Sequence, residues 1–180
     1  MSAAMDIGID MENAAERSGV YRALAHAFTY DGQQTSPFGI SGADYNDAFD
    51  PSVNEHACSL CEGAHTEEDR SSLFEELMRF YDFFGLGRGE AVEMPDHLSV
   101  ELEFMHFLTH LESQVADRPD DLFSVKRAQR DFLMRHLSRL VDAVRKGLKT
   151  DNPQCVELVE TCHEFVSAEV ALAKEYAETS

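Results

Sequence analysis

The stretch "EMPDHLSVELEFMHFL", residues 93–108, decides the fold. After a short turn around its proline, Leu98, Leu102, Met105 and Leu108 recur at intervals of three and four residues. That spacing places the four side chains on one face of a helix. An apolar face this broad predicts a helix buried among other helices.

Similar periodicity recurs elsewhere in the chain. It predicts helices over residues 11–30, from about 66 to 85, over 119–148 with a break, and from Pro153 onward. No segment shows the alternation of a half-buried strand, and no repeat of fixed period is present. We therefore predict an all-α fold, a single-domain helical bundle over residues 1–180 whose first ten residues are flexible.

Residues 31–65 differ from the rest of the chain. Gly, Pro, Asn, Asp and Ser are frequent there, and no apolar period persists. We expect a long irregular loop between the first two helices, with at most one short helical turn. Loops longer than about 12–15 residues within a compact domain are usually functional or disordered.

The charge distribution limits the partners. The formal net charge is −19, yet residues 118–149 carry nine Lys or Arg and only four Asp or Glu. An excess of carboxylates disfavours nucleic acid, whose phosphates require cations. It favours basic partners, although solubility and adaptation to high salt explain the same composition.

No membrane or secretory segment is expected. The first residues lack a basic stretch followed by an apolar core, and no run approaches the roughly 20 apolar residues of a membrane span. We predict a cytoplasmic protein without stable membrane insertion, whose four cysteines are reduced thiols.

Two metal-site hypotheses compete with a binding function. Glu103–His106 and Glu160–His163 are Glu-x-x-His pairs on separate predicted helices, a pattern of di-iron carboxylate bundles. The alternative function is therefore a di-iron oxidoreductase, but two further glutamates within apolar stripes are missing. Cys58 and Cys61 have zinc-ligand spacing, although a second such pair is absent. We expect neither a metal nor a cofactor, and not an enzyme, because no catalytic triad or phosphate loop occurs.

Asp96 and His97 stand where the helix of the opening stretch begins. An Asp or a neighbouring polar residue at this position can simply cap the helix, which we expect to start at Asp96 or Ser99. The alternative is an exposed polar pair beside an apolar groove, suited to a basic peptide.

The chain resembles the TorD/DmsD/NarJ family of redox-enzyme maturation chaperones. The resemblance rests on "MPDHLSVELEFMHFL", "KRAQRDFLMRHLSRLVDAV", "VYRALAHAF", "LFEELMRFYDFFGL" and "VELVETCHEFVSAE", and covers most of the chain. It is closest to the branch serving ethylbenzene, dimethylsulfide and chlorate-type molybdoenzymes.

This resemblance implies a cytoplasmic chaperone that binds the twin-arginine signal peptide of an apo-molybdoenzyme catalytic subunit, assisting cofactor insertion and export proofreading. It implies a monomer or a domain-swapped dimer. The peptide-binding residues it implies are Asp96, His97, Glu62, Tyr45, Phe49 and Glu101. The stretch "CSLCEG", residues 58–63, stands where the family has a Cys-Pro-Pro-aromatic-Glu segment. Ser59 and Leu60 replace the two prolines, which puts the role of the loop over residues 44–63 in question.

Overall fold

The computed structural model describes residues 8–87, 89 and 93–179, and confirms the all-α prediction. The α-helices are α1 (Ala14–Ala27), α2 (Gly42–Phe49), α3 (Arg70–Phe83), α4 (Leu98–Gln114), α5 (Pro119–Phe132), α6 (Ser138–Gly147) and α7 (Pro153–Thr179). Within the described ranges the only β-type pairing is an isolated antiparallel bridge between Cys61 and His97.

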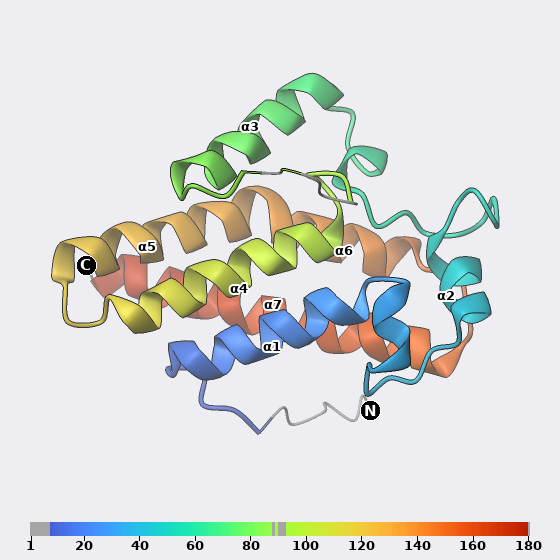
Figure 1. The fold of residues 1–180 in the computed structure, drawn as a ribbon, viewed down its shortest axis with the longest axis horizontal. Coiled ribbons are helices and arrows are strands. Elements are labelled where there is room, and N and C mark those ends of the chain that lie inside the picture. The colour runs from blue at the N-terminus through green and yellow to red at the C-terminus, as the bar shows by residue number, and fades with distance from the viewer. Residues whose placement is uncertain (1–7, 88, 90–92, 180) are drawn as a thin grey trace.

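The long helices form a bundle with two smaller attachments. Helix α4 packs against α1 and α5, and α6 packs against α7 (Figure 1). Figure 1 also shows α3 lying across one side of the bundle and α2 at one end. The core is built where the apolar stripes of these helices face one another.

The stripe predicted for the opening stretch is buried as expected. Leu102, Met105 and Leu108 have no exposed surface. Phe104, on the same helix, packs edge-on against Phe132 of α5, with ring centroids 4.7 Å apart. Burying an aliphatic or aromatic side chain of this size contributes about 1.5–3 kcal/mol, so this helix accounts for much of the core.

Local sequence signals determine the helix ends. The Asn13 side chain accepts from the N–H groups of Ala15 and Glu16 and so caps α1. The Asp69 side chain caps α3 by accepting from Ser72 N–H, so this helix starts later than the predicted residue 66. Gly85, with φ +74°, follows the end of α3, in agreement with the sequence.

The predicted break within residues 119–148 is a π-helical turn. Residues Leu133–Leu137 join α5 directly to α6 with the wider π geometry. Such a turn inserts an extra residue and shifts the following side chains around the helix axis. Here it directs His136 into the protein interior, where only 2% of its surface is exposed.

The prediction for residues 31–65 was partly wrong. This segment contains the eight-residue helix α2 and two 3-10 turns, Asp31–Gln34 and Glu62–Ala64. Its apolar residues Tyr45, Ala48, Phe49, Cys58 and Leu60 belong to the main core. Local periodicity was too short to reveal the helix, which is capped by Ser41 and held by tertiary packing.

Two further predictions concern the chain's ends and its membrane relation. The flexibility expected for residues 1–10 falls mainly on 1–7, which lie outside the described residues. Of the helices in the described ranges, none has the length and apolar character needed to traverse a bilayer.

The aromatic contact between α4 and α5 gives a first test. We expect Phe132→Ala to lower the free energy of unfolding by about 3–5 kcal/mol, because a fully buried ring leaves a cavity. Phe123→Ala on the same helix removes a ring that is 50% exposed and should change stability by about 0.5 kcal/mol or less. Urea unfolding monitored by circular dichroism measures both. Equal losses would contradict the described packing of α5.

Candidate functional site

Two segments distant in the sequence lie side by side just before α4. Glu62 N–H donates to the Asp96 carbonyl at 2.9 Å, and Leu98 N–H donates to the Leu60 carbonyl at 2.8 Å. These bonds satisfy backbone groups that α4 and the irregular segment cannot satisfy internally. The start of α4 is thereby fixed to the segment that follows α2.

Asp96 is buried, contrary to the expectation of an exposed pair. Only 2% of its surface is exposed, and its Oδ2 accepts from Gly63 N–H at 2.8 Å. A Cβ at position 63 would lie 3.0 Å from that oxygen, closer than ordinary contact, so a larger residue there would displace the carboxylate by a few tenths of an ångström. The carboxylate holds two chain segments together and is not positioned to pair with a guanidinium group arriving from solvent.

His97 caps α4 and faces a surface pocket. Its Nδ1 accepts from Ser99 N–H at 3.1 Å and lies 2.8 Å from Ser99 Oγ. This arrangement assigns the ring hydrogen to Nε2, which lies 3.8 Å from a Glu93 carboxylate oxygen. Burial lowers the pKa of His97, so the neutral ring is favoured at neutral pH.

Glu62 forms a buried pair with the histidine of the π-helical turn. Its two carboxylate oxygens lie 3.1 and 3.0 Å from His136 Nδ1. His136 Nε2 lies 3.4 Å from Glu76 Oε1 on α3. The imidazole therefore connects the 3-10 turn at residues 62–64 to α3 and to the α5–α6 helix.

Glu101, in the first turn of α4, lies next to the Glu62 carboxylate of this pair. It has no exposed surface. Burial, and then the neighbouring Glu62 carboxylate, raise its pKa well above the ordinary range. This environment favours the protonated form of Glu101, because two adjacent buried carboxylates are both ionised only at a large free-energy cost.

A pocket of about 460 Å³ opens beside His97. Tyr45 and Phe49 of α2 line it, and both are largely buried, at 7% and 4% exposure. The Tyr45 hydroxyl donates to the Phe28 carbonyl at 2.9 Å, which fixes this ring. Tyr30, 54% exposed, also lines the pocket, and its ring centroid lies 6.1 Å from that of Tyr45.

Two carboxylates that sequence reasoning did not select also line this pocket. They are Asp50, at the end of α2, and Glu93, ahead of the joint. Asp50 Oδ1 accepts from both the N–H and the hydroxyl of Ser52. The structure thus divides the predicted residues: Tyr45, Phe49 and His97 line the pocket, whereas Asp96, Glu62 and Glu101 are buried behind its wall.

The histidines and Glu160 of the di-iron alternative bind different partners on different helices. His106 Nδ1 lies 2.8 Å from Ser18 Oγ on α1, whereas His163 Nε2 lies 3.0 Å from Asp142 on α6. Glu160 accepts from Arg145 at 2.9 Å. The two Glu-x-x-His pairs are not brought to one centre. In the ranges 8–87, 89 and 93–179, no three His, Cys, Asp or Glu side chains are arranged to hold a metal ion.

The cysteines have environments of ordinary thiols. All four are free, and the Cys58 sulfur lies 3.6 Å from the Val144 carbonyl oxygen in the core. Burial raises the pKa of Cys58 and raises that of Cys61 to about 11, which disfavours the thiolate needed for metal binding or redox chemistry. His65, four residues after Cys61, has its Nε2 2.7 Å from the Ser59 carbonyl oxygen.

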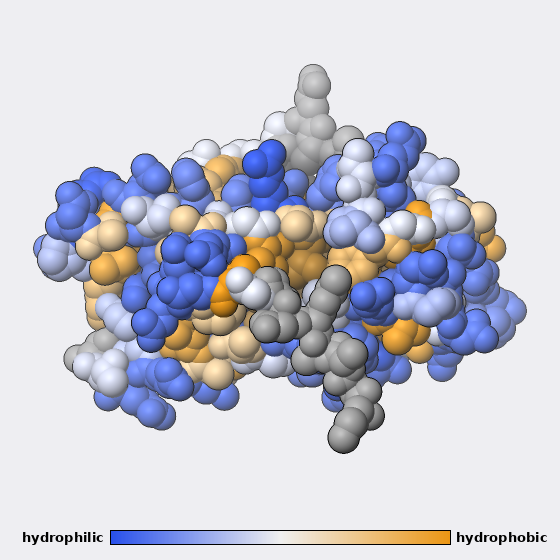
Figure 2. Space-filling model, turned by 90° about the horizontal axis from the view of Figure 1, so that it is seen from below, coloured by the Kyte–Doolittle hydropathy of each residue, from blue (hydrophilic) through white to orange (hydrophobic). Residues whose placement is uncertain are grey.

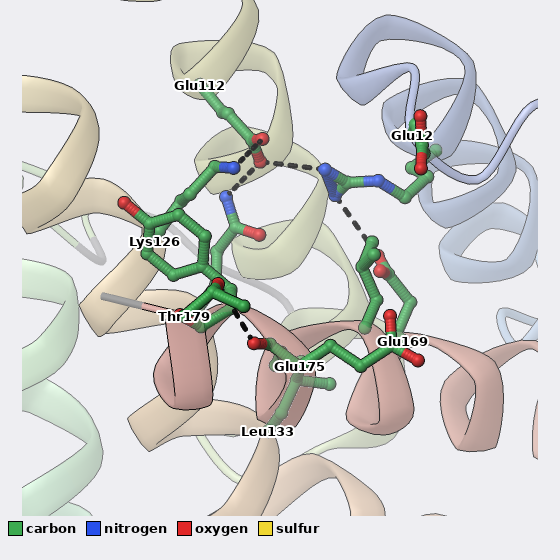
Figure 3. Close-up of a pocket in the computed structure, with 12 residues that line it drawn as sticks. Glu12, Glu112, Lys126, Leu133, Glu169, Glu175 and Thr179 are labelled. Atoms are coloured by element: carbon green, nitrogen blue, oxygen red, sulfur yellow. Dashed lines mark hydrogen bonds and ion pairs between the residues drawn. The ribbon is translucent and has the colours of Figure 1, made fainter. Parts of the chain in front are cut away.

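A second polar cluster was not predicted from the sequence. Arg17 of α1 is 3% exposed and contacts Glu112 at 2.9 Å and Glu169 at 3.6 Å. Figure 3 shows these side chains converging at a pocket between α1, α4, α5 and α7, where Lys126 and Gln129 also reach Glu112. Burial raises the pKa of Glu169 to about 7, against the opposing effect of the Arg17 guanidinium.

One sequence signal could have identified this cluster. Arg17 precedes Tyr21 and Leu24 by four and seven residues, which places a charged side chain on the buried face of α1. A buried arginine needs a carboxylate partner. Its partners Glu112 and Glu169 lie on α4 and α7, far along the chain, so only the tertiary structure identifies them.

These features define a helical bundle with a surface pocket beside the fixed start of α4. Comparisons with known proteins identify its family. The family model described as the nitrate reductase delta subunit matches residues 16–145. The perchlorate reductase assembly chaperone protein of Dechloromonas aromatica is 37% identical over 125 residues, which cover 67% of this chain and 56% of that protein. The selenate reductase assembly chaperone protein of Thauera selenatis is 37% identical over 127 residues, 66% of each chain.

The chain belongs to the nitrate reductase delta subunit family, which confirms the resemblance to TorD, DmsD and NarJ proteins. The chlorate reductase assembly chaperone protein of Ideonella dechloratans is a further relative, 36% identical over 129 residues. The matched segments span between about half and two thirds of these relatives' own lengths.

The role of Asp96 can be tested by stability. Asp96→Ala leaves the Gly63 N–H without its acceptor and should cost about 1–3 kcal/mol in free energy of unfolding. Asp96→Asn retains an oxygen acceptor and should cost clearly less. Chemical denaturation compares the two variants. An alanine variant as stable as the wild type would show that this contact does not hold the joint.

Glu169 predicts a pH dependence of stability. Its pKa is about 7 in the folded chain and about 4.3 when unfolded, so between these values the folded state binds more protons. Its contribution to stability is therefore lost as pH rises from about 4.3 to 7. Between about pH 5 and pH 8 the wild type should lose about 1–3 kcal/mol more than Glu169→Gln. Glu175→Gln, at an exposed position of the same pocket, should retain the wild-type slope.

Proposed function

We propose that this chain is an assembly chaperone for a molybdenum-containing oxidoreductase and binds the twin-arginine signal peptide of its apo catalytic subunit. The relatives named as assembly chaperones of perchlorate, selenate and chlorate reductases support the general role. The observation that carries the peptide-binding proposal is the pocket beside His97, which combines aromatic walls with two carboxylates.

The peptide's charge is recognised at Asp50 and Glu93. A guanidinium group can bind a carboxylate through two parallel hydrogen bonds, each contributing about 1.5–3 kcal/mol when partly desolvated. The exposed ring of Tyr30 adds a surface on which a guanidinium can stack, worth about 0.5–1 kcal/mol. These groups replace Asp96 as the proposed charge partners, because Asp96 is buried.

The remaining contacts fix the peptide's orientation and bury its apolar residues. His97 Nε2–H is directed to the pocket side of the joint and can donate to a peptide carbonyl. Apolar side chains of the peptide cover the exposed ring of Tyr30, contributing about 25 cal/mol per Å² buried, while Tyr45, Phe49 and Leu60 form the nearly buried floor of the pocket. Ordering a flexible leader opposes binding, so the net affinity is smaller than the sum of these contacts.

Asp96 and Glu62 act on the peptide through the shape of the pocket, and the buried Glu101 lies next to Glu62. Asp96 holds Gly63, and Glu62 holds the same 3-10 turn against His136. The segment carrying Leu60 and Cys61, which forms one wall of the pocket, is thereby kept in place. In this proposal Asp96 and Glu62 are positioning residues.

The wider biological features follow from this role. Binding in the cytoplasm retains the leader until the cofactor is inserted, and the chain itself performs no catalysis and holds no cofactor. The proposal places the protein in the cytoplasm as a monomer or a domain-swapped dimer.

Isothermal titration calorimetry with a synthetic twin-arginine leader peptide tests the proposal. We expect saturable binding that weakens with added salt, because exposed charge pairs are screened. The double variant Asp50→Asn/Glu93→Gln should bind about tenfold more weakly, equivalent to about 1.4 kcal/mol. The Asp50→Asn substitution preserves an oxygen acceptor for Ser52, so the fold should be retained.

A matched control separates local from overall charge. Asp117→Asn/Asp121→Asn also removes two negative charges, but in and just after the α4–α5 turn, at the end of the bundle remote from α2 (Figure 1). This variant should bind the leader like the wild type. If both double variants bind the leader equally weakly, the pocket is not the binding site, and the acidic surface as a whole attracts the peptide.

A further inference from the structure

The surface between α3 and α5 contains an aromatic groove of about 420 Å³, separate from the pocket beside His97. Phe83 of α3 is 79% exposed and Phe123 of α5 is 50% exposed, and both line this groove. Phe80, three residues before Phe83, and Phe84, directly after it, connect the groove to the core. Two largely exposed phenylalanines facing one groove form an apolar patch of the kind that marks an interaction surface.

The charge around this groove is opposite to that of most of the chain. Arg79, Arg127 and Arg135 line it, against the carboxylates of Glu76 and Asp131. Arg135 lies 3.5 Å from Glu76, and Arg127 lies 3.9 Å from Asp131. Both of these arginines remain largely exposed, at 60% and 65% of the side chain. Arg79 takes part in none of the ion pairs found among the described residues.

We propose that this groove docks an acidic amphipathic helix of a protein partner. Aromatic and arginine side chains are enriched in protein interfaces, and a mixed patch of this type receives apolar side chains flanked by Asp or Glu. Within a chain of net charge −19, a groove with a surplus of arginine selects against basic segments. Resting on the proposed function, the partner is the client enzyme, which contributes an acidic helix distinct from its basic leader.

Charge assigns the two client segments to two surfaces. The basic leader is attracted to Asp50 and Glu93 and repelled by the guanidinium groups of the α3–α5 groove. An acidic helix has the opposite preference. Figure 2 shows the face seen from below, away from α3, which is mainly hydrophilic with apolar residues gathered along its middle. What distinguishes the groove is the combination of exposed phenylalanine with arginine.

A pair of synthetic helices, each about 18 residues long so that the helix can form, tests the groove. Both carry leucine at intervals of three and four residues; one carries glutamate and the other lysine on the flanking positions. Fluorescence anisotropy should show saturable binding of the glutamate peptide alone. Phe123→Ser and Arg79→Glu should each weaken that binding about tenfold or more. Val53→Ser, which removes an exposed apolar side chain in the turn after α2, should leave it unchanged.

Three results would contradict docking of an acidic helix in this groove. The first is equal binding of the lysine peptide, and the second is unchanged binding in the Phe123 and Arg79 variants. The third is a dimer in sedimentation experiments that Phe123→Ser converts to a monomer, since a second copy would then occupy the groove. If the glutamate peptide binds as predicted while the twin-arginine peptide does not bind, the groove stands and the proposed leader site fails.

Discussion

The fixed start of α4 is the constraint on which the described surfaces depend. The Asp96 carboxylate holds Gly63, and Glu62 from the same turn holds His136 in the π-helical turn. These contacts connect three parts of the chain that no local interaction would bring together. Without them, the segment of residues 58–64 would keep its backbone bonds to Ala48, Asp96 and Leu98, but the turn at residues 62–64 would lose the side-chain contacts that hold it. The pocket wall that this segment contributes would then be less firmly held.

This constraint is unusual because it is built from buried ionisable groups. A buried carboxylate is costly unless its charge is paired or its proton is retained. The structure uses both solutions: Glu62 faces His136, and the raised pKa of Glu101 favours its neutral form. Near the other end of α4, the Arg17–Glu112–Glu169 cluster is also built from buried ionisable groups. Such pairs add more to the choice of one packing arrangement than to net stability, in our interpretation.

The surfaces that result are segregated by charge. The pocket beside His97 is acidic and aromatic, whereas the α3–α5 groove is aromatic with a surplus of arginine. The basic stretch over residues 118–149 supplies much of that arginine. For a protein with a large negative charge, this separation provides a physical means of distinguishing basic from acidic segments of a partner. It also ties the uneven charge distribution of the sequence to particular places in the fold.

The sequence by itself determined the long helices, because the apolar spacing of residues such as Leu102, Met105 and Leu108 depends only on helix periodicity. It also indicated the family, and three residues that the resemblance pointed to, Tyr45, Phe49 and His97, line a pocket. Only the tertiary structure decided which polar residues are accessible. The sequence suggests an exposed charge at Asp96, directly after a proline. In the structure Asp96 is buried and accepts a hydrogen bond from Gly63, 33 positions away. Burial is a property of packing between distant segments, and local sequence does not encode it directly.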